Sequence, residues 1–170
     1  MEDLQLIRLF VRQSFTESGN TEKLIVQQVL NLLQSLNGNP YYLEVMTGLA
    51  AQSQDTFRCT FESTTGLKFT PQNFRTVRLK LLAQADAMII VRTGLSESGA
   101  FEIAYNVFAG RKVPMFFAVW QPSPIKTTML RDLEDLCTTV KYMTFENPNE
   151  LRKPLSDFMG LLHSQKLATV

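Results

Sequence analysis

Residues 92–102 combine small, hydroxyl and acidic side chains in a pattern that suits anion binding. In one-letter code the segment reads RTGLSESGAFE, and it directly follows a short run of apolar residues, Ala87–Val91. If the apolar run is a strand and Ser98 or Gly99 opens a helix, the unpaired N–H groups at the start of that helix favour a phosphate or a carboxylate. Glycine and serine also crowd ordinary turns, so a purely structural loop is the alternative interpretation.

Glu102 is the candidate catalytic residue of this segment. It falls in the first turn of the expected helix, where the helix dipole lowers the pKa of a carboxylate and keeps it ionised. An ionised carboxylate suits a nucleophile or an electrostatic stabiliser better than a general acid. The alternative is a glutamate that only complements the dipole. In either case, replacing Glu102 by glutamine is expected to cost only a few tenths to about 1 kcal/mol of stability.

Arginine side chains are the expected partners of a bound anion. Arg12 and Arg92 end two expected strands and therefore point toward the mouth of one crevice. Arg78, one helical turn after Arg75, could add positive charge there, with a solvated basic helix face as the alternative. An anionic substrate fits these residues better than a neutral nucleoside. The predicted substrate-binding residues are Arg12, Ser14, Arg78, Arg92, Ser96, Ser98 and Gly99.

The elements that must position these residues alternate along the chain. Apolar runs predict strands at residues 4–11, 41–46, 87–91, 113–119 and 140–145. Periodic apolar stripes and capping residues predict helices at about residues 23–36, 70–84, 98–109, 127–136 and 147–163. Residues 48–70 are less regular. There, Phe57, Cys59 and Phe61 alternate with polar residues, which predicts a short edge strand or hairpin arm.

This alternation predicts an α/β fold built as a single domain over residues 1–170. The expected architecture is a five-stranded parallel sheet flanked by helices, in the flavodoxin-like or Rossmann-like order 2-1-3-4-5. In that order the direction of the connections reverses between the first and third strands. The crevice at the carboxyl ends of those two strands is therefore the predicted ligand site.

Composition restricts the classes of partner. Seventeen Lys and Arg against sixteen Asp and Glu leave a net charge of +1, so neither nucleic acid nor a membrane is an expected partner. The longest apolar run, residues 113–120, is too short to cross a bilayer, and the acidic start does not resemble a secretory signal. A cytoplasmic protein is expected, with Cys59 and Cys137 reduced. The sequence predicts no cofactor and no metal site.

Three segments together resemble the nucleoside 2-deoxyribosyltransferase superfamily, which includes nucleoside 5'-monophosphate N-glycosidases. They read ADAMIIV at 85–91, SESGAFEIAY at 96–105 and AGRKVP at 109–114, within a stretch of resemblance that covers about residues 74–119. The resemblance implies that Glu102 is the nucleophile, that Ser96 helps to hold a 5'-phosphate and that Asp86 is structural. Two features depart from the family pattern. Arg78 stands where an aspartate is usual, and the loop after the first strand lacks a glycine-rich start.

The resulting hypothesis is a hydrolase or transferase that acts on the N-glycosidic bond of a nucleotide or related anionic ribosyl compound. The alternatives are a non-catalytic nucleotide-binding or scaffold protein, or a biosynthetic enzyme with a diverged reaction. A homodimer or larger assembly is also expected, because the helix at 98–109 is apolar almost all round.

Overall fold

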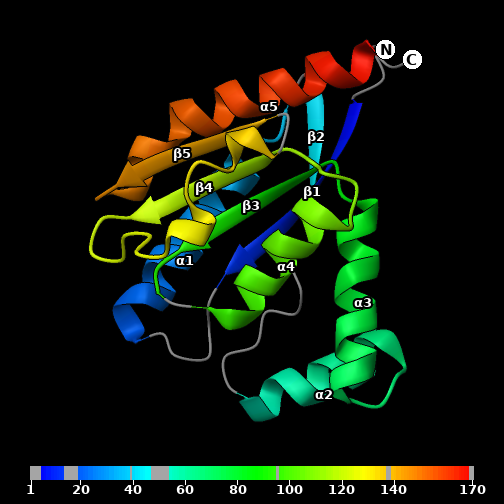
Figure 1. Cartoon of the computed structure of the whole chain (residues 1–170). Helices are drawn as coiled ribbons and strands as arrows, with labels where there is room; N and C mark the ends of the chain where they lie inside the picture. The colour runs from blue at the N-terminus through cyan, green and yellow to red at the C-terminus, as the bar shows by residue number, and fades with distance from the viewer. Residues whose placement is uncertain are drawn as a thin grey trace.

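Five parallel strands form the centre of the molecule, in the order β2-β1-β3-β4-β5 (Figure 1). The computed structural model describes residues 5–13, 19–38, 40–46, 54–94, 96–136 and 139–168. The strands are β1 (Gln5–Gln13), β2 (Tyr41–Val45), β3 (Ala87–Arg92), β4 (Met115–Trp120) and β5 (Val140–Phe145). The predicted fold class and strand order are therefore confirmed, and the fold is flavodoxin-like.

The strands β3 and β4 are buried on both faces of the sheet. Every residue from Ala87 to Val91 and from Met115 to Val119 is at most 7% exposed. Such strands read as unbroken apolar runs, because helices cover both sides of the sheet and no position faces water. β1 lies beside β3 with Val11 opposite Ile89, so the carboxyl ends of these two strands are neighbours as predicted.

The helices form a layer on each face of the sheet (Figure 1). Apolar residues of α1 and α5 pack on one face, and those of α4 with the end of α3 pack on the other. The helices are α1 (Asn20–Ser35), α2 (Gln54–Thr65), α3 (Pro71–Gln84), α4 (Glu97–Phe108) and α5 (Arg152–Leu167). The predicted start of α3 and the predicted capping residues before α5 are confirmed. Thr70 Oγ1 accepts a hydrogen bond from Asn73 N at 3.1 Å, and Asn147 with Glu150 forms a capping box.

The segment predicted as an edge strand is instead the helix α2. Phe57 and Phe61 lie four residues apart, on one helical face, and both pack on Phe69 and Phe74. Cys59, the third member of the alternating pattern, is exposed. The alternation of three apolar residues is too short to separate a strand from a helix, and burial against α3 decides between them.

The helix predicted at residues 127–136 is also absent as a continuous element. Thr128–Leu130 and Leu133–Asp135 form two separate 3-10 turns. Asp132 lies between them with φ of 52°, a left-handed conformation that no helix can pass through. The guanidinium of Arg131 donates to the carbonyl of Ile125, which holds this segment as a turn after β4.

Candidate functional site

Residues from two strands and one helix meet at the point where the direction of the connections reverses. Arg12 and Arg92 lie at the carboxyl ends of β1 and β3, and α4 begins directly beyond them. We call the small cavity here the β1–β3 crevice. It has a volume of about 30 Å³ and is lined by Arg12, Gln13, Ile90, Val91, Arg92, Gly94, Ser96, Gly99, Ala100, Ile103, Phe117, Ile125 and Leu130. The predicted location of the site is therefore a real concavity.

Arg12 is tied to the first turn of α4. Its Nη2 donates to Ser96 Oγ at 2.5 Å and its Nη1 to the Gln13 carbonyl at 2.9 Å. Ser96 Oγ also accepts the Gly99 N–H at 3.0 Å, which makes Ser96 the N-cap of α4. A Cβ on Gly99 would lie 3.2 Å from Arg12 Nε. Gly99 and Ser96 therefore serve to seat this guanidinium against the helix.

Glu102 lies between two arginines rather than at an open mouth. It is 4% exposed, and Arg78 clamps it with Nε 2.8 Å from Oε1 and Nη2 3.3 Å from Oε2. Arg12 Nε lies 3.2 Å from Oε2, an ion-pair distance without hydrogen-bond geometry. The Arg78 guanidinium also stacks 4.3 Å above the ring of Phe10. We call this group the Arg12–Glu102–Arg78 triad.

The triad carries a net charge of +1 in a buried place. Burial lowers the pKa of Arg12, and neighbouring Arg78 lowers it further, while the Glu102 carboxylate acts in the opposite direction. Arg78 is 7% exposed, so it does not belong to a solvated basic helix face, whereas Arg75 is exposed. Both oxygens of Glu102 are engaged by guanidinium groups, which leaves the carboxylate poorly placed to act as a nucleophile.

Arg92 differs from the other two arginines because it lacks an acidic partner. Within the described residues, no carboxylate lies at ion-pair distance from it, and its Nε has no hydrogen-bond partner. Its Nη2 makes one long contact of 3.4 Å to the Pro124 carbonyl. Burial lowers the pKa of Arg92. A half-buried cation without a counter-charge is a natural anchor for an anionic ligand.

Two buried polar atoms that the sequence analysis missed lie at the ends of β1 and β3, and one of them belongs to Gln13, which lines the crevice. Gln13 Oε1 and Thr93 Oγ1 are buried and have no hydrogen-bond partner among the described residues. Gln13 and Thr93 directly follow Arg12 and Arg92, so the predicted strand ends could have identified both. Ser123 Oγ donates to the Thr93 carbonyl at 2.8 Å and thereby links the loops that follow β3 and β4.

The predicted site residues divide between two cavities. Arg12, Arg92, Ser96 and Gly99 line the β1–β3 crevice. A second cavity, which we call the α3–α4 groove, has a volume of about 460 Å³ and is lined by Pro71, Phe74, Arg75, Arg78, Leu79, Glu97, Ser98, Phe101 and Glu102. Ser98, Arg78 and Glu102 thus belong to the groove. Ser14 lies outside the described residues.

Neither a metal site nor a membrane-spanning helix occurs in the part of the chain that the structure describes. No group of three or more His, Cys, Asp or Glu side chains is close enough there to hold a metal ion. None of the helices within those same ranges combines the length and the apolar character needed to cross a bilayer.

Comparison with known proteins finds no family model and no curated protein that matches the chain. Among solved structures, the chain is similar to an FMN-dependent NADH-azoreductase from Bacillus anthracis str. Ames Ancestor in complex with FMN. The sequences are 10% identical, the match covers 97% of this chain and 99% of that chain, and the TM-score is 0.42.

These findings correct the functional hypothesis drawn from the sequence. The similar structure is named as an azoreductase in complex with FMN, and not as a hydrolase, transferase or glycosidase that acts on a nucleotide substrate. The geometry of this chain conflicts with the hypothesis, because the intended nucleophile Glu102 is held by Arg78 and Arg12. The prediction of N-glycosidic chemistry is therefore wrong. The resemblance to the deoxyribosyltransferase superfamily itself stays a prediction, since no family model matches.

Proposed function

We propose that this protein binds flavin mononucleotide, with the phosphoryl group at the β1–β3 crevice. The single observation that carries the proposal is Arg92, a half-buried cation at the crevice with no acidic partner among the described residues. The fold gives the location its meaning, because flavodoxin-like sheets of order 2-1-3-4-5 bind FMN at the β1/β3 switch point.

The residues present fit the anionic end of such a ligand. Besides Arg92, the start of α4 and the start of α1 both lie at this edge of the sheet. Gly19, the N-cap residue of α1, has no side chain to satisfy the first N–H groups of that helix, and no side-chain cap is formed. The N-terminus of α1, which has no side-chain cap, favours phosphate through its N–H groups and its dipole.

The small size of the crevice favours the phosphoryl group over the ring system as its occupant. A volume of about 30 Å³ is roughly that of two water molecules by the same measure, which suits phosphoryl oxygens only. Gln13 lines the crevice, and its buried Oε1, which has no hydrogen-bond partner among the described residues, is free to orient a ligand. When bound, FMN supplies redox chemistry; the role of these side chains is to hold and orient its anionic end.

The experiment compares FMN with riboflavin, which lacks the phosphate. Titration by flavin fluorescence is expected to show FMN binding at least about 10-fold more tightly, since a charge-assisted hydrogen bond contributes about 1.5–3 kcal/mol. Arg92→Gln should weaken FMN binding by about 10- to 150-fold and leave riboflavin binding nearly unchanged. Arg152→Gln, at an exposed arginine that does not line the crevice, is the matched control.

Two outcomes contradict the proposal. Equal affinity of the wild-type protein for FMN and riboflavin would mean that no phosphate site exists. Equal loss of both ligands in Arg92→Gln would mean that Arg92 supports the fold rather than the ligand.

A further inference from the structure

The α3–α4 groove is a cavity of ligand size that the proposed function does not use. Its volume of about 460 Å³ falls within the range typical of small-molecule sites. It lies between the amino-terminal halves of α3 and α4, whereas the β1–β3 crevice lies at the carboxyl ends of the strands. The inference that follows is independent of FMN binding.

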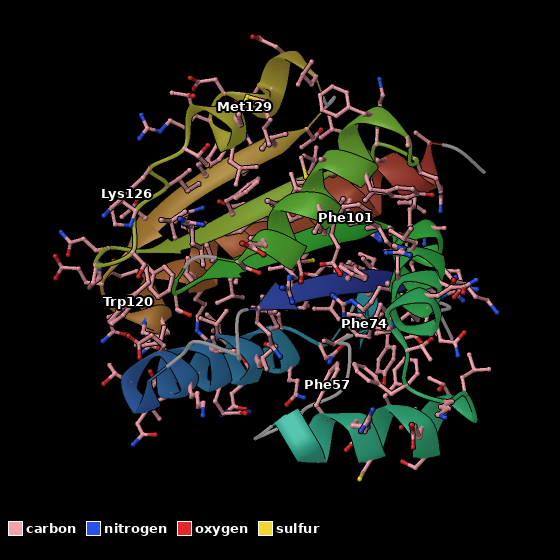
Figure 2. The ribbon with its side chains drawn as sticks, turned by 60° about the horizontal axis from the view of Figure 1, so that its bottom comes forward. Phe57, Phe74, Phe101, Trp120, Lys126 and Met129 are labelled. Carbon is pink, nitrogen blue, oxygen red and sulfur yellow. The ribbon has the colours of Figure 1, made fainter. Side chains whose placement is uncertain are left out.

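Aromatic side chains from both helices wall the groove. Phe74 projects from α3 and Phe101 from α4 (Figure 2). Phe74 is fixed from behind by Phe57, Phe61 and Phe69, whose ring centroids lie 5.4–6.0 Å from its own. Phe101 is 52% exposed, an unusual state for a phenylalanine beside a cavity. A planar apolar group placed between these rings would bury surface that water now covers.

Positive charge lies at the floor and rim of the groove. At the floor, Arg78 donates hydrogen bonds from Nε and Nη2 to the Glu102 carboxylate. No hydrogen bond joins its Nη1 to any described residue. At the rim, Arg75 is exposed and makes no ion pair within the described ranges. Glu97 on the opposite rim adds one negative charge. Because the triad behind the floor carries +1, the groove and the triad together retain a positive balance of one charge.

We propose that the α3–α4 groove binds a small aromatic carboxylate. The ring packs between Phe74 and Phe101, and the carboxylate pairs with the free edge of Arg78 and with Arg75. A carboxylate matches the planar fork of a guanidinium, and one negative charge matches the excess of one positive charge. The Ser98 hydroxyl, at the start of α4, is a further donor on the groove wall.

The test uses 2-naphthoate as the probe and 2-naphthalenemethanol as its neutral counterpart. Titration followed by amide chemical shifts is expected to move resonances of α3 and α4 and to give at least 10-fold tighter binding of the carboxylate. Saturation with FMN, or Arg92→Gln, should leave naphthoate binding unchanged, which separates failure of this site from failure of the crevice.

Matched variants separate the groove from general surface effects. Arg75→Gln should weaken naphthoate binding at least 3-fold, whereas Lys80→Gln, on the same helix outside the groove, should not. Phe101→Ala should weaken both probes at least 5-fold, whereas Phe108→Ala, at a more exposed position of α4 outside the groove, should not.

Three results would overturn the proposal. One is the absence of saturable shifts in α3 and α4, and another is equal binding of the charged and neutral probes. The third is a fall in sedimentation coefficient on Phe101→Ala without any loss of naphthoate binding, which would assign the groove to a second copy of the chain.

Discussion

Glu102 shows how one turn of helix changes the role of a residue. The sequence pattern places it in the first turn of a helix that starts at Ser98 or Gly99, but α4 begins at Glu97. Glu102 therefore lies in the second turn, on the buried side, where Arg78 reaches it from α3. Helix starts are uncertain by a residue or two, and that shift decides whether a carboxylate faces solvent or a neighbouring element.

The triad also explains why a substitution judged mild from the sequence is expected to be severe. Glu102→Gln leaves Arg78 and Arg12 buried with no counter-charge. Breaking a buried ion pair by removing one partner costs about 3–5 kcal/mol, and we expect a loss of at least about 3 kcal/mol here. Urea unfolding curves would measure it.

Glu97→Gln is the control for that measurement. Glu97 is exposed in the first turn of the same helix, so its loss should change stability by no more than about 0.5 kcal/mol. A cost below about 1 kcal/mol for Glu102→Gln would show that the carboxylate acts only as a dipole contact.

At the scale of elements, the sequence predicts what periodicity alone can determine. The predicted strands β3 and β4 are confirmed. An unbroken apolar segment of five or six residues is typical of a strand that is buried on both faces of a sheet. The crevice follows from strand order, and Arg12 and Arg92 follow from the strand ends. The triad could not be predicted, because the contact of Arg78 with Glu102 depends on how α3 leans on α4.

The pair formed by α2 and α3 is held by aromatic packing that the sequence analysis misread as strand alternation. Phe61 is 1% exposed and lies against Phe69 and Phe74, with ring centroids 5.4 and 6.0 Å away. Phe61→Ala should destabilise the protein by about 3–5 kcal/mol, because it leaves a cavity that the two helices cannot close. It should also raise hydrogen exchange throughout α2.

Phe108→Ala provides the comparison for that element. Phe108 is 70% exposed, so its truncation should change stability by less than about 0.5 kcal/mol. If Phe61→Ala lost no more stability than Phe108→Ala, α2 would contribute nothing to the folded core.

The outer face of α4 bears on the state of the whole molecule. Phe101 and Phe108, about two helical turns apart, leave large apolar surfaces exposed on a single chain. The homodimer expected from this helix stays a prediction, because one chain has no neighbour to show.

A group of hydrogen bonds connects the end of the described chain to its beginning. It lies at the amino-terminal ends of the strands, opposite the crevice. The last turn of α5 lies beside the amino-terminal end of β1 (Figure 1), where Lys166 Nζ donates to the Leu6 carbonyl and to Asp86 Oδ2, both at 2.8 Å. Asp86 in turn accepts the Arg8 N–H at 2.7 Å. Asp86 therefore makes structural contacts far from the crevice, in agreement with the role that the family resemblance implies.

Lys166→Met is expected to loosen this closure of the whole molecule. It removes two charge-assisted hydrogen bonds from a pair whose side chains are only 33% and 18% exposed, and we expect a loss of about 1.5–3 kcal/mol. Lys153→Met, which breaks the exposed i,i+4 pair with Asp157 on the same helix, should cost no more than about 0.5 kcal/mol. Unfolding curves would measure both, and hydrogen exchange should rise in the last turn of α5 for Lys166→Met alone. Equal losses of stability in the two variants would show that the Lys166–Asp86 ion pair contributes no more than an exposed surface pair.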